Sequence, residues 1–226
     1  MKLKTAPQEM SYAKANGTDY NIEVFCDFQL ISFLLILMGK STDVQSVYGL
    51  GMSENSWDES LLLQSGTMNT KGLFWGENTG KAGVKVFGME NFYGNQWKLT
   101  LGLILDYSTI KYKLTESTID GSTATSYNTD GSGYISVSDS APVGTSGGYI
   151  KFMKFTADGM FPKEASGSSN TYFHDGYWFN INQINLAHCG GDLASVRRVG
   201  LCVYLNSAPP NAYWNLGAGL SCKPSK

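Results

Sequence analysis

The sequence predicts an α+β fold with small mixed or antiparallel sheets, one buried helix, a second short helix and many loops. The 226 residues include 26 glycines, and 13% of the chain is aromatic, which is typical of strands joined by tight turns. Several short segments alternate between apolar and polar residues, as half-buried strands do. One run, residues 28–38, is apolar on nearly every side over a length that suits a helix.

The N-terminal residues 1–18 are polar and mixed, so we expect a tail or linker there. The remainder, residues 19–226, is long enough to bury one large core, and we expect a single domain. Within it, residues 20–25 alternate and predict a short strand.

The apolar run predicts a helix over about residues 27–38. Asp27 is a plausible N-cap, and Gly39 is a candidate for the C-terminal cap. Because this helix is apolar nearly all round, we expect it to be buried on most faces. The second short helix is expected somewhere in residues 41–64.

Residues 86–101 combine turn residues with aromatic side chains. Gly94 and Asn95 both tolerate a positive φ, so they predict a turn. The following residues read as a strand with Trp97, Leu99 and Leu101 on one face. A buried tryptophan brings a large apolar surface, so we expect a structural hub here rather than a catalytic site. The hub residues are Gly88, Glu90, Asn91, Gly94, Asn95 and Trp97.

Composition argues against several classes of function. The net charge is −2 and 16% of residues are charged, whereas a dedicated nucleic-acid binder normally has a basic stripe. The four cysteines fit no zinc spacing, and we expect buried free thiols. Residues 130–133 (D-G-S-G) look like half a calcium loop without its other ligands, so a turn is expected. We therefore predict no metal and no cofactor, and no apolar run is long enough for membrane insertion.

Two histidines stand beside chemically capable neighbours. His174 precedes Asp175, and His188 precedes Cys189, which would suit a general base and a nucleophile pair respectively. Neither pair has the remaining parts of a catalytic site nearby in the sequence. We expect packing or surface roles for both histidines.

Two segments near the C-terminus alternate strictly and predict strands. In residues 199–206 the expected core side chains are Val199, Leu201, Val203 and Leu205. In residues 213–222 they are Trp214, Leu216, Ala218, Leu220 and Cys222. If the strands are close, a shared outward surface would hold Tyr204, Asn206, Tyr213 and Asn215, rimmed by Asp192, Arg197 and Arg198. Such side chains suit recognition of a sugar or protein, although alternation alone is equally compatible with ordinary solvent-facing residues.

Phe87-Gly88-Met89-Glu90-Asn91-Phe92-Tyr93-Gly94-Asn95-Gln96-Trp97 resembles the G-L-x-D-M-x-G-N-V-W-E-W signature of the formylglycine-generating-enzyme (sulfatase-modifying-factor) family. That family is a branch of the C-type-lectin-like fold, so the resemblance implies this fold. More widely, four segments resemble the C-terminal module of phage and prophage tail proteins from gut bacteria: K-S-T-D-V-Q-S-V-Y-G, G-T-M-N-T-K-G-L-F-W-G, V-K-V-F-G-M-E-N-F-Y-G-N-Q-W around Trp97, and Y-W-N-L-G-A-G-L-S-C-K-P. The similarity extends from about Asn21 onward, and some such proteins are diversified near their C-terminus by retroelements.

The resemblance implies a receptor-binding module that is not an enzyme. Its partners would be a host cell-surface glycan or protein and other tail subunits, and its location the virion tail or, alternatively, a bacterial cell surface. Tail fibres are commonly trimers, so a homo-oligomer is implied, although no heptad run is present. A structural tail or baseplate protein is the first alternative, and a degenerate formylglycine-generating-type enzyme is the second.

Two departures from family patterns bear on these alternatives. The enzyme family has two copper-binding cysteines close together, whereas Cys189, Cys202 and Cys222 are each more than ten residues apart. Sugar-binding C-type lectins have E-P-N or W-N-D calcium triplets, but here Leu216 follows Trp214-Asn215. Copper oxidase activity and calcium-dependent sugar binding are therefore not expected.

Overall fold

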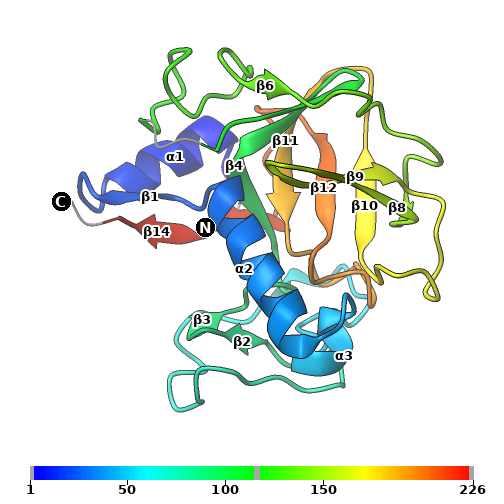
Figure 1. The fold of residues 1–226 in the computed structure, drawn as a ribbon. Helices are drawn as coiled ribbons and strands as arrows, with labels where there is room; N and C mark the ends of the chain where they lie inside the picture. Colours follow the sequence, from blue (N-terminus) through cyan, green and yellow to red (C-terminus); the bar gives the residue numbers. More distant parts are fainter. Residues whose placement is uncertain (1–2, 115–117, 224–226) are drawn as a thin grey trace.

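The computed structural model describes residues 3–114 and 118–223, which combine helices with a large mixed sheet (Figure 1). Within the described residues the large sheet has eight strands: seven follow one another in the order β6-β5-β4-β11-β12-β10-β7, and the eighth, β13, also pairs with β4. The α+β prediction is confirmed, but this sheet is larger than the small sheets expected. Its strands are β4 (Trp97–Asp106), β5 (Thr109–Tyr112), β6 (Ile135–Ser136), β7 (Gly147–Tyr149), β10 (Gly176–Phe179), β11 (Ile184–Cys189), β12 (Val203–Ser207) and β13 (Leu216–Ala218).

Three two-stranded sheets surround the large one in the described chain. They pair β1 (Tyr20–Ile22) with β14 (Leu220–Cys222), β2 (Lys85–Val86) with β3 (Met89–Glu90), and β8 (Phe152–Thr156) with β9 (Gly159–Glu164). The predicted second short helix is α3 (Val44–Tyr48), followed by the 3-10 helix η1 (Glu59–Leu61).

Strand β4 is the centre of the large sheet and contributes to the core on both faces. Its pairing with β11 is interrupted opposite Leu186 and Ala187, next to Gly102, which has a φ of 89°. This bulge changes the face to which alternate side chains point. Leu99 and Leu101 join one apolar cluster, as predicted, whereas Leu103 beyond the bulge joins another.

Helix α2 (Phe25–Gly39) covers one face of the large sheet (Figure 1). The expected helix is present, but Asp27 is not its N-cap, because the helix already begins at Phe25. The cap is Val24, which is tied to β4 by a bridge to Leu101. At the other end the cap is Lys40, with a φ of 51°, directly after Gly39.

The prediction that this helix is buried on most faces is wrong. Leu37 is 70% exposed, and Leu30 and Met38 are also exposed. Two polar residues are instead on the buried side: Gln29 donates to the Met160 carbonyl at 2.6 Å, and the Ser32 hydroxyl donates to the Phe28 carbonyl at 2.7 Å. Because these polar groups have partners, their burial is tolerated, and hydropathy alone does not identify the packed face.

The prediction of an N-terminal tail or linker is wrong for residues 6–14, which form helix α1 (Ala6–Lys14). Thr5 caps this helix in a reciprocal capping box with Gln8. Ala6, Met10 and Ala13 are buried with Leu99 and Leu101 on the sheet face opposite to α2. Residues 1–2 of the predicted tail lie outside the described residues.

Among the described residues, no helix combines the length and the apolar character needed to cross a membrane.

Candidate functional site

The turn that precedes β4 holds a neighbouring loop through a side-chain amide. Gly94 and Asn95 have φ angles of 74° and 71°, as a turn built from these residues requires. The Asn95 side chain accepts from the Leu63 N–H at 2.8 Å and donates to the Leu63 carbonyl at 3.1 Å. One amide side chain thereby pairs with the backbone of loop 63–69 as a strand would.

The acid of the same turn holds this loop at a second point. The Glu90 carboxylate accepts hydrogen bonds from the Gly66 N–H at 2.6 Å and the Met68 N–H at 2.9 Å. Asn91 is buried, and its N–H donates to the Val84 carbonyl at 2.7 Å. The contacts of Asn95 and Glu90 are those of a structural hub, because they fix backbone that is 22 to 32 positions away in the sequence.

Trp97 begins β4 and supports a group of half-exposed side chains. It is 3% exposed, and its ring contacts Trp178 edge-on at a centroid distance of 5.3 Å and Tyr204 at 5.2 Å. The Arg198 guanidinium lies 5.0 Å from the Trp178 ring and 5.8 Å from the Tyr149 ring. We call Trp97, Tyr149, Trp178, Arg198 and Tyr204 the aromatic platform.

Strand pairing explains why the platform residues meet. Trp178 on β10 is paired with Tyr204 on β12, and Tyr204 is paired with His188 on β11. His188 is in turn paired with Leu99, two residues after Trp97. Directly paired residues point to the same face, so this row places Trp178 and Tyr204 on the same side of the sheet as Trp97.

The predicted core face of β12 is correct. Val199, Leu201, Val203 and Leu205 are all buried, with at most 2% of each exposed. The regular strand is shorter than predicted, because only Val203–Ser207 are in β12. Tyr204 and Asn206 alternate with the buried residues and are half-buried.

Two of the predicted surface residues are buried instead. Asp192 is 2% exposed and accepts hydrogen bonds from the Ser195 hydroxyl at 2.6 Å and the Asn215 amide at 2.7 Å. Burial raises the pKa of Asp192, and the hydrogen bonds from Asn215 and Ser195 oppose that shift. This pair anchors the C-terminal segment to the loop after β11, so Asp192 and Asn215 do not belong to an exposed binding surface.

The remaining predicted residues do reach the surface. Tyr213 is 53% exposed. Burial is the largest cause that raises the pKa of Tyr204, and the nearby Tyr213 is the second. Arg197 is exposed with a φ of 52°, whereas Arg198 lies over Trp178. Of the predicted residues, Tyr204 and Tyr213 are therefore close to one another, and Asn206 is on the same strand as Tyr204. Arg198 lies over Trp178, which is paired with Tyr204.

The second alternating segment is not one continuous strand. β13 pairs with β4 and β14 pairs with β1, and the two are separated at Gly219. Leu220 and Cys222 are consequently exposed rather than inward-facing, while Asn215 is buried. Alternation fails here because each short piece has a different partner.

Trp57 is an exposed tryptophan near this surface that alternation does not identify. It meets the ring of Trp214 edge-on at a centroid distance of 5.8 Å. Trp214 was expected to point inward, but it is half-buried. Trp57 is 69% exposed, and its loop is held by hydrogen bonds from Asn55 and Ser56 to the Leu193 carbonyl. A tryptophan in the polar stretch 53–60 was the only available signal.

The two buried cysteines, Cys189 and Cys202, lie on neighbouring backbone segments although 13 positions separate them in the sequence. Cys189 ends β11, and the next residue, Gly190, donates its N–H to the Cys202 carbonyl at 3.3 Å. Both thiols are free and buried, and burial raises the pKa of each well above its usual value. They are therefore protonated thiols rather than activated nucleophiles. Among the described residues, no group of three or more His, Cys, Asp and Glu side chains could hold a metal ion.

No protein-family model matches the chain, and no curated protein matches it.

His188 lies under the platform, with its ring edge-on to Tyr204 at 6.3 Å. Burial lowers its pKa from 6.5 to about 4, and its Nδ1 atom has no hydrogen-bond partner in the part of the chain that the structure describes. It is therefore neutral at pH 7, and the general-base geometry with Cys189 is absent because adjacent strand residues point to opposite faces.

This burial predicts an acid-sensitive core. As the pH falls from 6.5 to about 4, the unfolded chain binds a proton at His188 while the folded chain does not, so stability decreases. We expect the contribution of His188 alone to fall by about 3 kcal/mol over this window, seen as a change in the stability difference between the wild type and His188→Gln, because one pKa unit is worth about 1.4 kcal/mol. Urea unfolding of the wild type and of His188→Gln at several pH values measures it. A difference between the two proteins that does not change with pH would contradict the assignment.

Proposed function

We propose that this chain is a ligand-binding module of a phage or prophage tail, with a C-type-lectin-like fold, and that the aromatic platform contacts a host-surface ligand. The observation that supports the proposal is the stacking of half-exposed Trp178, Tyr204 and Arg198 on or around the buried Trp97. The resemblance of the segment around Trp97 to tail modules supports the assignment to a tail. In this proposal the chain forms a homo-oligomer such as a trimer. Other tail subunits attach this oligomer to the virion, so that the platform is presented to the host cell.

The platform has the chemistry of a recognition surface. Aromatic faces provide flat apolar area that an aliphatic sugar face or a partner side chain can cover, and tyrosine adds a hydroxyl. Arg198 provides several N–H donors, and its stacking on two rings restricts its orientation before a ligand arrives. Less conformational entropy is then lost on binding.

A pair of substitutions tests this proposal. Trp178→Ala combined with Tyr204→Ala should weaken binding to host cells or to an arrayed host glycan by about 1,000-fold, since two hot-spot aromatic residues at about 2 kcal/mol each contribute about 4 kcal/mol together. The matched control is Tyr107→Ala, which removes a 56% exposed tyrosine from the turn between β4 and β5. Binding should be unchanged in this control, and circular dichroism should show that all the proteins are folded.

The main alternative is a structural tail or baseplate protein without ligand recognition. The exposed apolar side chains of α2, including Leu37 at 70%, favour it because they could pack on a neighbouring subunit. Normal adsorption by particles that carry the double platform variant would reject recognition by the platform. Failure of those particles to assemble would support the structural alternative.

A further inference from the structure

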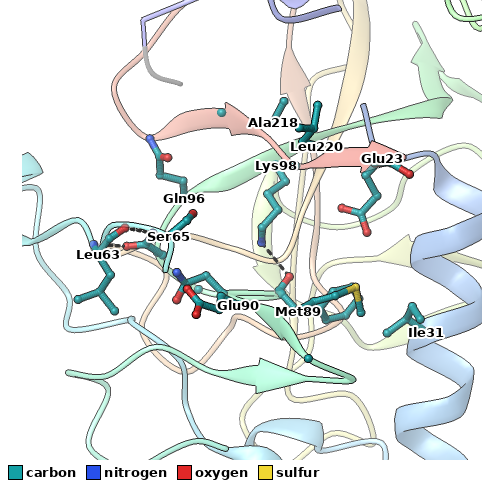
Figure 2. A pocket seen from close by; sticks show the side chains of 18 of the residues that line it. Glu23, Ile31, Leu63, Ser65, Met89, Glu90, Gln96, Lys98, Ala218 and Leu220 are labelled. Carbon is teal, nitrogen blue, oxygen red and sulfur yellow. Dashed lines mark hydrogen bonds between the residues drawn. The ribbon is translucent and has the colours of Figure 1, made fainter. Parts of the chain in front are cut away.

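A cavity of about 660 Å³ lies beside the start of β4 (Figure 2). It is on the side of β4 opposite to the aromatic platform. Its position follows from strand geometry, because Lys98 lines the cavity while its neighbour Trp97 supports the platform. Four segments enclose it: the start of α2, loop 63–69, the turn before β4, and the C-terminal residues 217–221. The volume is within the range of small-molecule sites.

Lys98 points into this cavity from β4. Its ammonium donates to the Phe92 carbonyl at 2.8 Å, which fixes the end of the side chain in the position that Figure 2 shows. Burial lowers the pKa of Lys98, and the nearby Glu23 carboxylate opposes this shift. An ammonium has three donors, and one carbonyl satisfies only one of them.

Glu23 faces the cavity from the short connection between β1 and α2. Its backbone is fixed, because its N–H donates to the Gly219 carbonyl at 3.2 Å and its carbonyl accepts from the Leu101 N–H at 3.1 Å. Among the described residues, neither Glu23 nor Lys98 has an oppositely charged group within 4 Å. Burial raises the pKa of Glu23, and the nearby Lys98 ammonium opposes this shift. Within the described part of the chain, both ionisable groups therefore line a partly enclosed space without an ion-pair partner.

The other acids of the cavity are already engaged. Asp27 pairs with Lys223 at 3.3 Å, and both oxygens of Glu90 accept backbone N–H groups of loop 63–69. Glu23 and Lys98 are therefore the two charges of the cavity wall that a ligand would meet. Ile31, Met89 and Leu220 provide apolar wall between and beside them (Figure 2).

Gly219 separates the two charged side chains. A Cβ atom at this glycine would lie 3.6 Å from the Glu23 Oε2 atom and 3.7 Å from the Lys98 Cδ atom. No backbone atom is among these nearest neighbours, so the open side of Gly219 is cavity. A ligand that contacts both charges would pass across this glycine.

We propose that this cavity binds a small zwitterion, with a ligand carboxylate at Lys98, a ligand ammonium at Glu23 and an apolar portion against Ile31 and Met89. An α-amino acid or a dipeptide has this chemistry. A charge that is partly removed from water is costly unless it is paired, and a zwitterion supplies both missing partners at once. This site is separate from the platform and does not depend on the tail assignment.

Titration calorimetry with glycyl-leucine tests the proposal. The matched probes are N-acetyl-glycyl-leucine, which lacks the ammonium, and glycyl-leucinamide, which lacks the carboxylate. We expect the dipeptide to bind with a Kd of about 1 mM or tighter and each analogue to bind about 10-fold more weakly, as the loss of one charged contact implies. No heat of binding from the dipeptide, or equal affinity for all three probes, would overturn the proposal.

Two variants test whether the dipeptide binds in this cavity. Gly219→Ala adds a methyl group at ordinary van der Waals distance, so the protein should fold normally while the dipeptide binds about 10-fold more weakly. Glu23→Gln should remove the preference for the ammonium, so that the dipeptide and its N-acetyl analogue bind equally. Unchanged binding in both variants would exclude this cavity. Tyr107→Ala, at an exposed turn outside both sites, should leave dipeptide binding intact.

Discussion

Replacing Trp97 by alanine is expected to lower the free energy of unfolding by about 3–5 kcal/mol, as is usual for a buried tryptophan. The side chain is 3% exposed and shares an apolar cluster with Cys202 and Leu216. Its ring also contacts Trp178 and Tyr204, so the substitution leaves a cavity directly beneath the platform. Ligand binding should therefore decrease even at temperatures where the variant remains folded.

Chemical unfolding of the purified variant measures the first effect. The matched control is Trp57→Ala, which removes the same side chain from a position that is 69% exposed, and which should change stability by no more than about 0.5 kcal/mol. Similar losses in the two variants would show that Trp97 is not the centre of the cluster. If folded Trp97→Ala binds the ligand with unchanged affinity, the aromatic platform is not the binding site.

Features that depend on neighbouring residues could be predicted from the sequence. The turn at Gly94 and Asn95 follows from their tolerance of positive φ, and the hydrogen bonds of Asn95 then use that turn. The inward face of β12 follows from alternation, because a one-residue shift would expose every apolar side chain such as Val203 and Leu205.

Features that depend on contacts between residues far apart in the sequence could not be predicted. Trp178 meets Tyr204 only because β10 and β12 pair in parallel, and the sequence between them gives no signal for this neighbour. Likewise, Asp192 and Asn215 read as surface residues until their hydrogen bond across 23 positions is known. Polar residues are buried where a partner exists, and the partner is a property of the fold.

The start of the N-terminal helix α1 is marked by a capping signal in the sequence. Thr5-Ala6-Pro7-Gln8 matches a capping box with proline in the first turn, which predicts a helix start. The polar composition of residues 1–18 instead suggested a tail. Small buried residues such as Ala6 and Ala13 let α1 lie close to β1 without a strongly apolar stripe.

Replacing Glu9 by glutamine is expected to stabilise the protein at neutral and alkaline pH. Glu9 is 2% exposed on the packed face of α1, and its Oε1 atom has no hydrogen-bond partner among residues 3–114 and 118–223. Burial raises its pKa from 4.5 to about 7. From pH 4.5 to 7 the unfolded chain loses this proton before the folded chain does, so wild-type stability falls as the pH rises. The accumulated loss is on the order of 3 kcal/mol above pH 7.

Glutamine resembles the neutral carboxylic acid, so Glu9→Gln should match the wild type near pH 4 and exceed it at pH 8. His188 acts with the opposite sign, since its contribution is lost as the pH falls from 6.5 to about 4. The two buried groups therefore offset one another in the wild type over most of this range, and each substitution should uncover the slope of the other group. Urea unfolding of both single variants and the wild type from pH 4 to pH 8 tests this. If Glu9→Gln is more stable than the wild type by the same amount at both ends of the range, ionisation of Glu9 is not the cause, and α1 is stabilised by the amide itself.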